Sequence, residues 1–190
     1  MSNPAPPEQL LTVLLAEYGQ LKDEQAQRIG HRDNLVYATL TAAAATIVGV
    51  VQTHAAALLL ALAPVCVLLG WTYLANDRMV TAIGRYLRDD LAPRLESFAG
   101  TGVLGWEHEH CGDTRRRQHK CFQLAANLLT FVLPGAAAST AAVVAGHPAW
   151  LVVAGAIVAF ALLAVLAWQL VAHADLPPKP PCAPDRSATG

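Results

Sequence analysis

The chain has 190 residues, of which 54% are hydrophobic and only 14% are charged, and its formal net charge at pH 7 is −1. Soluble domains carry about 25% charged residues, so this composition excludes a disordered chain and argues against a soluble globular protein. The near-zero net charge argues against a basic nucleic-acid-binding protein, and no nucleic-acid partner is expected. Four scattered cysteines do not form the framework of a disulfide-rich secreted domain. The sequence predicts an integral membrane protein.

Four apolar stretches are long enough to cross a bilayer as helices, which takes about 20 residues. They are residues 35–53, 55–75, 122–145 and 149–172, and none contains Asp, Glu, Lys, Arg or His. They lack the alternation of polar and apolar residues that is typical of a membrane β-barrel. The predicted fold is therefore all-α: an integral membrane protein with four transmembrane helices in two hairpins, 35–76 and 122–172, and cytoplasmic helical extensions.

The distribution of positive charge predicts the orientation. All 13 Lys and Arg residues lie before residue 35, between residues 76 and 122, or after residue 172, and the two short loops carry none. The positive-inside rule then places both termini and the central segment in the cytoplasm, with the spans in the plasma membrane. The start of the chain, MSNPAPPEQLL, lacks the basic region and cleavage site of a signal peptide.

The segment 1–34 is predicted to form a cytoplasmic amphipathic helix. Its apolar residues fall near one helical face; they are Leu11, Leu14, Leu15, Tyr18, Leu21 and Ile29. Only Gly19 and Gly30 interrupt the pattern, so the helix can continue into the first apolar stretch and reach about 70 Å between Pro7 and Thr53. Three environments stay open for its apolar face: the chain's own cytoplasmic segment, a coiled contact between copies, or the membrane surface.

A second amphipathic helix is predicted within the segment 77–121. Its apolar residues recur every three or four positions; they are Met79, Val80, Ile83, Tyr86, Leu87, Leu91 and Leu95. We expect it to continue from the second apolar stretch, to be disturbed near Pro93, and to carry helix-spaced ion pairs, Arg85 with Asp89 and Arg94 with Asp90. The simplest interpretation packs this helix on the N-terminal one as a small cytoplasmic stalk.

One cluster of residues resembles a metal site. Residues 106–121 read WEHEHCGDTRRRQHKC, and imidazole and thiolate groups are zinc ligands. The weak candidate ligands are His108, His110, Cys111, His119 and Cys121. Their spacing is not that of a standard structural zinc site, so a solvated loop is the competing interpretation. No nucleophile–base pair is apparent, and the residues 100–105 match G-x-G-x-x-G without the strand that a nucleotide site requires. We expect a non-enzymatic protein with no catalytic residues and no cofactor.

Basic residues precede the third apolar stretch and are expected to fix the topology and contact membrane lipids. They are Arg115, Arg116, Arg117 and Lys120. Within or beside the apolar stretches, a few polar residues are candidates for a polar lining or for interhelical contacts; they are Thr46, Gln123, Asn127 and Thr130. The lack of ionisable groups at depth argues against proton pumps and ion-coupled transporters. Pro64 and Pro134 are expected to kink the second and third spans.

Three segments carry a resemblance to known sequences: EYGQLKDEQAQRIGHRDNLVYATL (17–40), LLGWTYLANDRMVTAIGRYLRDDLAP (68–93) and GWEHEH (105–110). They resemble a family of uncharacterised multi-span membrane proteins from actinobacteria, over about half of the chain. More remotely, a cytoplasmic helix, a membrane hairpin and a returning helix are similar to the SLATT-type membrane effectors of bacterial conflict systems. That resemblance implies a bacterial protein that assembles into membrane pores. This chain differs by a second hairpin, and no functional residue is carried over.

Two functions follow as hypotheses. The first is an oligomeric pore-forming or effector protein assembled through its cytoplasmic helices, because one chain of four spans is too small to enclose a polar pore. The alternative is a membrane-anchored scaffold whose cytoplasmic helices bind a protein partner. The Pro-rich tail, 173–190, is expected to be extended and disordered under either hypothesis. The number of chains in the assembly distinguishes the two.

Overall fold

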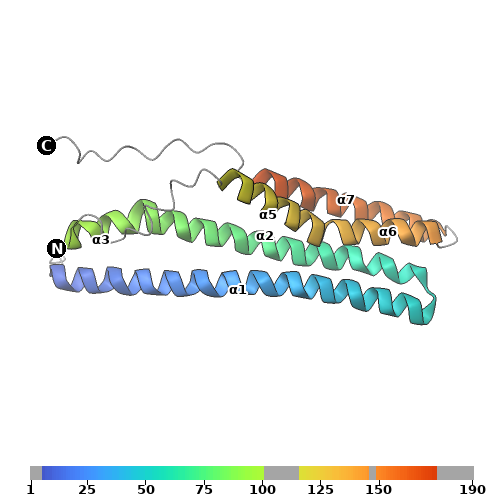
Figure 1. The fold of residues 1–190 in the computed structure, drawn as a ribbon, viewed down its shortest axis with the longest axis horizontal. Helices are drawn as coiled ribbons and strands as arrows, with labels where there is room; N and C mark the ends of the chain where they lie inside the picture. Colours follow the sequence, from blue (N-terminus) through green and yellow to red (C-terminus); the bar gives the residue numbers. More distant parts are fainter. Residues whose placement is uncertain (1–5, 101–115, 146–148, 175–190) are drawn as a thin grey trace, which may run out of the picture.

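The computed structural model describes residues 6–100, 116–145 and 149–174, and all regular elements within these ranges are helical (Figure 1). In chain order they are α1 (Pro7–Thr53), the 3₁₀ helix η1 (Ala56–Ala61), α2 (Leu62–Tyr86), the π-helical turn η2 (Leu87–Leu91), α3 (Ala92–Ala99), α5 (Arg116–Phe131), α6 (Leu133–Ala145) and α7 (Trp150–His173). Four helical stretches are long and apolar enough to cross a membrane. The all-α class and the number of apolar helices are thus confirmed.

Helix α1 runs without interruption for 47 residues, as the sequence predicted. Pro7 is its first residue, where a missing N–H leaves no hydrogen bond unmade. The helix ends at Thr53, and the next residue, His54, caps it: His54 has a left-handed backbone (φ 54°), and its N–H donates to the carbonyl of Val50. This cap reverses the chain, and the following helices run back alongside α1 (Figure 1).

The two prolines of the apolar stretches lie at helix starts. Helix α2 begins at Leu62 after the 3₁₀ helix, so Pro64 lies in its first turn, where helix geometry tolerates it. The helical geometry changes from 3₁₀ to α two residues before Pro64, and the kink at this residue stays a prediction. Pro134 is the second residue of α6, and the third apolar stretch is divided at Val132 into α5 and α6. The disturbance predicted at Pro134 is a one-residue interruption at Val132, across which helical hydrogen bonds continue.

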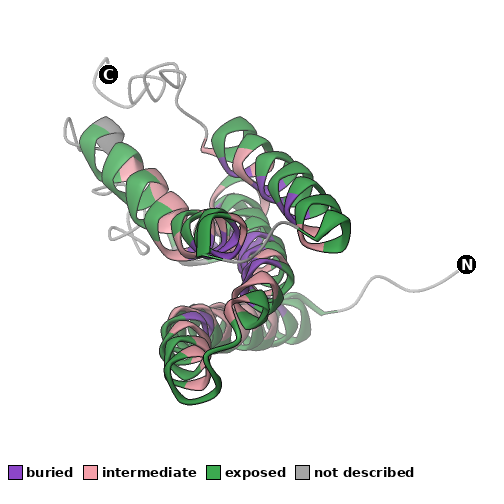
Figure 2. Ribbon diagram, turned by 90° about the vertical axis from the view of Figure 1, so that its right-hand side faces the viewer, coloured by how far each residue is buried: buried purple, intermediate pink, exposed green. Residues whose placement is uncertain are grey.

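Helix α2 is the centre of the bundle, with α1 on one side and α5, α6 and α7 on the other (Figures 1 and 2). Buried residues gather on the faces that the helices turn toward one another, and the outward faces are exposed. One apolar cluster joins Leu35, Tyr73, Leu74, Phe131, Leu166 and Leu170. A second cluster contains Leu62, Ala63, Cys66, Ala138, Ala159 and Leu163.

Small residues set the closest helix contacts. A Cβ atom on Gly135 would lie 3.2 Å from the Cα of Ala63, and one on Gly70 would lie 3.0 Å from the Cβ of Phe131. Glycine at these positions lets α2 approach α6 and α5, as small residues do in membrane helix pairs. The small residues Ala138 and Ala159 also lie in the core, in the second apolar cluster.

Helix α1 extends further along the molecule than α5, α6 and α7. There it lies beside the C-terminal part of α2 and beside α3 (Figure 1). We call residues 7–34 and 77–99 the stalk. Its core consists of Leu14, Ile83, Leu87, Leu91 and Leu95, with Leu11, Tyr18 and Leu21 packed against it. The predicted packing of the N-terminal helix on the chain's second amphipathic helix is confirmed.

The disturbance predicted near Pro93 takes the form of η2, one π-helical turn directly before it. The N–H of Ala92 donates to the carbonyl of Leu87, five residues back. Of the two predicted ion pairs, Arg94 with Asp90 is present at 2.9 Å. The other is wrong, because Asp89 pairs with its neighbour Arg88 at 3.0 Å in the widened turn.

Candidate functional site

A half-open pocket of about 260 Å³ lies where the stalk meets the apolar part of the bundle. Residues from α1, α2, α5 and α7 line it, with Ala174 directly after α7. They are Arg32, Tyr73, Leu74, Asp77, Val80, Thr81, Lys120, Gln123, Leu124, Asn127, Leu170, His173 and Ala174. Tyr73, Leu74 and Leu170 also belong to the first apolar cluster, so an apolar floor faces a polar rim.

The guanidinium of Arg32 is the central polar group of this pocket. Its Nη1 donates to Oδ1 of Asp77 at 3.0 Å, and the two side chains are 25% and 31% exposed. The guanidinium carbon also lies 5.7 Å from the ring centroid of Tyr73, within the range of a cation–π contact. These contacts use one of five N–H donors. Among the described residues no acceptor takes the others, so Arg32 can bind a further anionic group.

Arg78 does not line the pocket, but it connects α2 with α7 through His173, which does. Its Nη2 donates to Oε1 of Gln169 at 3.0 Å and lies 3.1 Å from Nδ1 of His173. That nitrogen is also 2.8 Å from the carbonyl oxygen of Gln169. A single ring nitrogen either accepts from the arginine or donates to the carbonyl, but not both. The tautomer of His173 therefore decides which contact forms.

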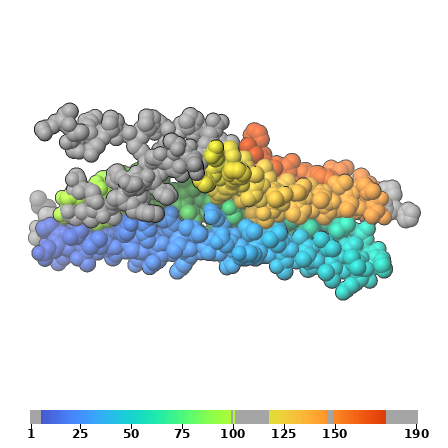
Figure 3. Space-filling view, viewed as in Figure 1, coloured from blue at the N-terminus to red at the C-terminus, as the bar shows by residue number. Residues whose placement is uncertain are grey.

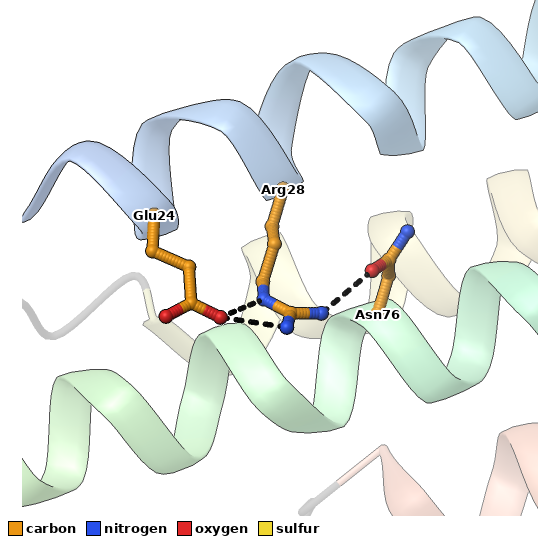
Figure 4. A network of polar contacts seen from close by, with 3 residues as sticks. All are labelled: Glu24, Arg28 and Asn76. Atoms are coloured by element: carbon orange, nitrogen blue, oxygen red, sulfur yellow. Dashed lines mark hydrogen bonds and ion pairs between the residues drawn. The ribbon is translucent and has the colours of Figure 1, made fainter. Parts of the chain in front are cut away.

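A third arginine, Arg28, does not line the pocket and joins α1 to α2, which runs alongside it (Figure 4). Arg28 donates from Nε and Nη2 to Oε1 of Glu24, at 2.9 and 2.6 Å, and from Nη1 to Oδ1 of Asn76 at 3.2 Å. The three consecutive residues Asn76, Asp77 and Arg78 thus each bind a different partner: Arg28 and Arg32 on α1, and the end of α7. This polar belt joins the helices where their apolar parts end.

Three residues predicted from the sequence line this pocket: Lys120, Gln123 and Asn127. Two other predicted polar residues do not. Thr46 donates to the carbonyl of Ala42 in its own helix at 2.8 Å, and Thr130 is half-buried in α5 outside the pocket lining.

The predicted metal site is only partly within the described residues. His119 and Cys121 are exposed on α5, while His108, His110 and Cys111 lie outside the described ranges. Among the residues that the structure describes, no group of three metal-ligating side chains comes together.

The predicted basic anchor is likewise described in part. Arg115 lies outside the described residues, and Arg116 and Arg117 begin α5. Of the Pro-rich tail, only the first two residues are described.

The sequence analysis missed Arg32, Asp77 and His173. A signal was present, since Arg32 lies three residues before the first apolar stretch and Asp77 lies two residues after the second. Two stretches predicted to pack side by side bring those ends together. The lining offers positive charge and N–H donors, and its hydroxyl groups are those of Thr81 and Tyr73. These residues do not form a nucleophile–base pair. The groups of the lining suit the binding of a ligand.

Comparison of the chain with known proteins found no matching family model, no matching curated protein and no matching solved structure. The function is therefore argued from the chain's own geometry.

Proposed function

We propose that this chain is a four-span protein of the plasma membrane that assembles with copies of itself into a non-enzymatic membrane effector, with a pore between the chains. One observation supports the assembly of several chains: of the four apolar helices, α1 has the smallest buried share. Only 11% of its apolar 18-residue segment is buried, against 33%, 28% and 22% of the corresponding segments of the other three helices. Its surface forms one side of the molecule along its whole length (Figure 3).

The orientation of the chain in the membrane is inferred from the positions of its Lys and Arg residues. The polar belt and the stalk carry the arginines, and the opposite ends of the four apolar helices carry no Lys or Arg. The positive-inside rule places the stalk, the pocket and both termini in the cytoplasm. The helices then form two membrane hairpins, α1 with α2 and α5–α6 with α7.

A pore within one chain would need a wet path, and the described interior is apolar. Its buried hydroxyl groups are satisfied inside their own helices: Thr39 donates to Leu35 and Ser139 to Gly135, both at 2.8 Å. Within the described ranges, no buried side-chain polar atom lacks a hydrogen-bond partner. Flux through the membrane therefore requires a path between chains.

The outward face of α1 suits contact with a second copy. Thr41, Ala44 and Ala45 are small residues at i, i+3 and i+4 spacing, and all three are exposed. Small residues permit close approach of membrane helices. We therefore assign the contact between chains to this face.

The alternative function is a membrane-anchored scaffold, and the stalk is the feature that favours it. Large apolar side chains there are exposed; they are Leu10, Val13, Leu15, Ile29, Met79 and Phe98. In the cytoplasm such residues would be covered by a protein partner. A monomeric chain with a bound cytoplasmic protein would support this alternative.

The test is the mass of the assembly in nanodiscs, measured for the wild type, for Ala44→Trp and for Ala161→Trp. Both alanines are exposed on apolar helices, α1 and α7, so the second variant controls for added bulk in the membrane. We expect a defined oligomer that only Ala44→Trp reduces, together with loss of ion flux in vesicles. A monomeric wild type, or equal effects of both variants, would contradict the proposal.

A further inference from the structure

We propose that the pocket around Arg32 binds the phosphate of an anionic membrane phospholipid, with the lipid's chains along the apolar floor. This inference concerns the pocket alone and holds whether or not the chains assemble. It assigns a ligand to side chains that the fold brings together from four helices.

The charge of the lining favours an anion. Arg32 and Lys120 are the positively charged residues of the lining, and Asp77 is the negatively charged one. Because Asp77 takes only the Nη1 donor of Arg32, the planar guanidinium keeps further N–H groups for a phosphate, the partner that its forked geometry suits. Gln123, Asn127 and Thr81 add neutral hydrogen-bonding groups around the same space.

The shape of the lining favours a lipid over a free anion. The apolar floor of the pocket lies beside the charged groups and consists of Tyr73, Leu74, Leu124 and Leu170. A soluble phosphate gains nothing from this floor, whereas a phospholipid places its acyl chains there. The volume of about 260 Å³ is below that of a typical drug-sized site, so it suits a lipid headgroup.

The location is also that of a lipid headgroup. The pocket lies where the apolar parts of α1, α2, α5 and α7 give way to the charged belt. Basic pockets between helices at this level of a membrane are suited to acidic headgroups, and each Lys or Arg near the surface contributes about 1 kcal/mol. That contribution corresponds to about a fivefold change in binding per charge.

The experiment uses the full chain in detergent, titrated with phosphatidylglycerol, phosphatidylcholine or inorganic phosphate, with retained lipid counted by native mass spectrometry. We expect retention of phosphatidylglycerol over phosphatidylcholine, and about fivefold weaker binding in each of Arg32→Gln and Lys120→Gln. Arg94→Gln is the matched control, because Arg94 is an exposed arginine on α3 whose ion pair with Asp90 lies outside the pocket. It should bind as the wild type does.

A fourth variant separates binding from folding. Asp77→Asn removes the negative charge and releases Arg32 while keeping the size of the side chain, so phosphatidylglycerol should bind about fivefold more tightly. Structural damage at this contact would instead weaken binding.

Three results would overturn the inference: equal retention of the two lipids, a loss in Arg94→Gln equal to that in Arg32→Gln, or weaker binding in Asp77→Asn. Binding of inorganic phosphate with the same dependence on Arg32, and no preference between the lipids, would assign the pocket to a soluble anion instead.

Discussion

The phenol of Tyr86 donates a hydrogen bond to Oε1 of Glu17 at 2.7 Å, across 69 residues of sequence. The bond joins the last residue of α2 to α1 within the stalk. It raises the pKa of Tyr86 above its ordinary value of 10.0, because the carboxylate acceptor favours the protonated phenol. Partial desolvation and the negative charges of Glu17 and Asp90 act in the same direction, and Arg94 opposes them.

The raised pKa of Tyr86 predicts how this contact depends on pH. A group whose pKa is higher in the folded state stabilises the fold below its unfolded pKa, here about 10. The stabilisation is lost as the pH rises through the folded value. The difference between the ultraviolet titrations of the wild type and of Tyr86→Phe should therefore show a phenol that ionises above pH 10.

The variant Glu17→Gln tests whether the Glu17 carboxylate raises the pKa of Tyr86. It keeps a hydrogen-bond acceptor but removes the charge, so the pKa of Tyr86 should move back toward 10. An unchanged titration in both variants would show that the contact does not form in solution.

Two glycines in helices should respond in opposite ways to the same added methyl group. In Gly135→Ala the new Cβ would lie 3.2 Å from the backbone Cα of Ala63, so α2 and α6 must separate. We expect a loss of about 1 kcal/mol in unfolding free energy from overpacking. At Gly19 no atom lies within 4 Å, and Gly19→Ala should add about 0.5–1 kcal/mol by favouring the helix.

Unfolding of both variants in the same detergent measures this difference. If Gly135→Ala were neutral, the close contact between α2 and α6 would be looser than the structure has it.

Helix positions could be predicted from the sequence because they depend on local hydrophobic pattern, whereas the closest contacts could not. The continuous helix from Pro7 to Thr53 follows from an unbroken pattern, and it forms. Gly70 and Gly135 are glycines in apolar stretches like Gly49 and Gly155, and only the helix crossing distinguishes them. The start of α2 near Pro64 similarly depends on the turn after His54.

The contact of Arg28 with Asn76 joins α1 to α2 and should be measurable by a double-mutant cycle. The Nη1–Oδ1 distance is 3.2 Å, and the Arg28 side chain is 30% exposed. A partly exposed hydrogen bond to a charged group should couple the two residues by about 1 kcal/mol. The cycle consists of Arg28→Met, Asn76→Ala and the double variant, compared by unfolding free energy.

The exposed pair Arg94 and Asp90 is the reference for that cycle. It lies within one helical region at i, i+4 spacing, so its coupling should be only about 0.3–0.5 kcal/mol. Equal couplings for the two pairs would mean that the contact between helices adds nothing beyond a surface ion pair.

The polar residues of the candidate site also fall into two groups: those that the sequence predicted and those that it did not. Lys120, Gln123 and Asn127 are polar residues near the start of an apolar stretch, so the sequence indicated them. Arg32 and Asp77 look like ordinary flanking charges until the pairing of α1 with α2 places them 3.0 Å apart. Their roles depend on contacts between residues distant in sequence, which a single sequence does not specify.

The stalk should melt separately from the apolar part when its core is reduced. Leu87 is only 1% exposed and lies in the π-helical turn, packed with Leu14, Leu91 and Leu95. Truncating a buried leucine to alanine costs about 2–5 kcal/mol. The stalk has one small cluster, while the rest of the bundle has two of its own. In Leu87→Ala, amide hydrogen exchange should therefore rise within residues 7–34 and 77–99 and stay unchanged in α6 and α7.

Leu15→Ala is the control for this prediction, because Leu15 lies in the same stalk but is 55% exposed and its removal leaves no cavity. It should change exchange little. If Leu87→Ala instead raised exchange in α6 and α7 as much as in the stalk, the two parts would unfold as one unit. The stalk could then not change conformation while the four apolar helices stay folded.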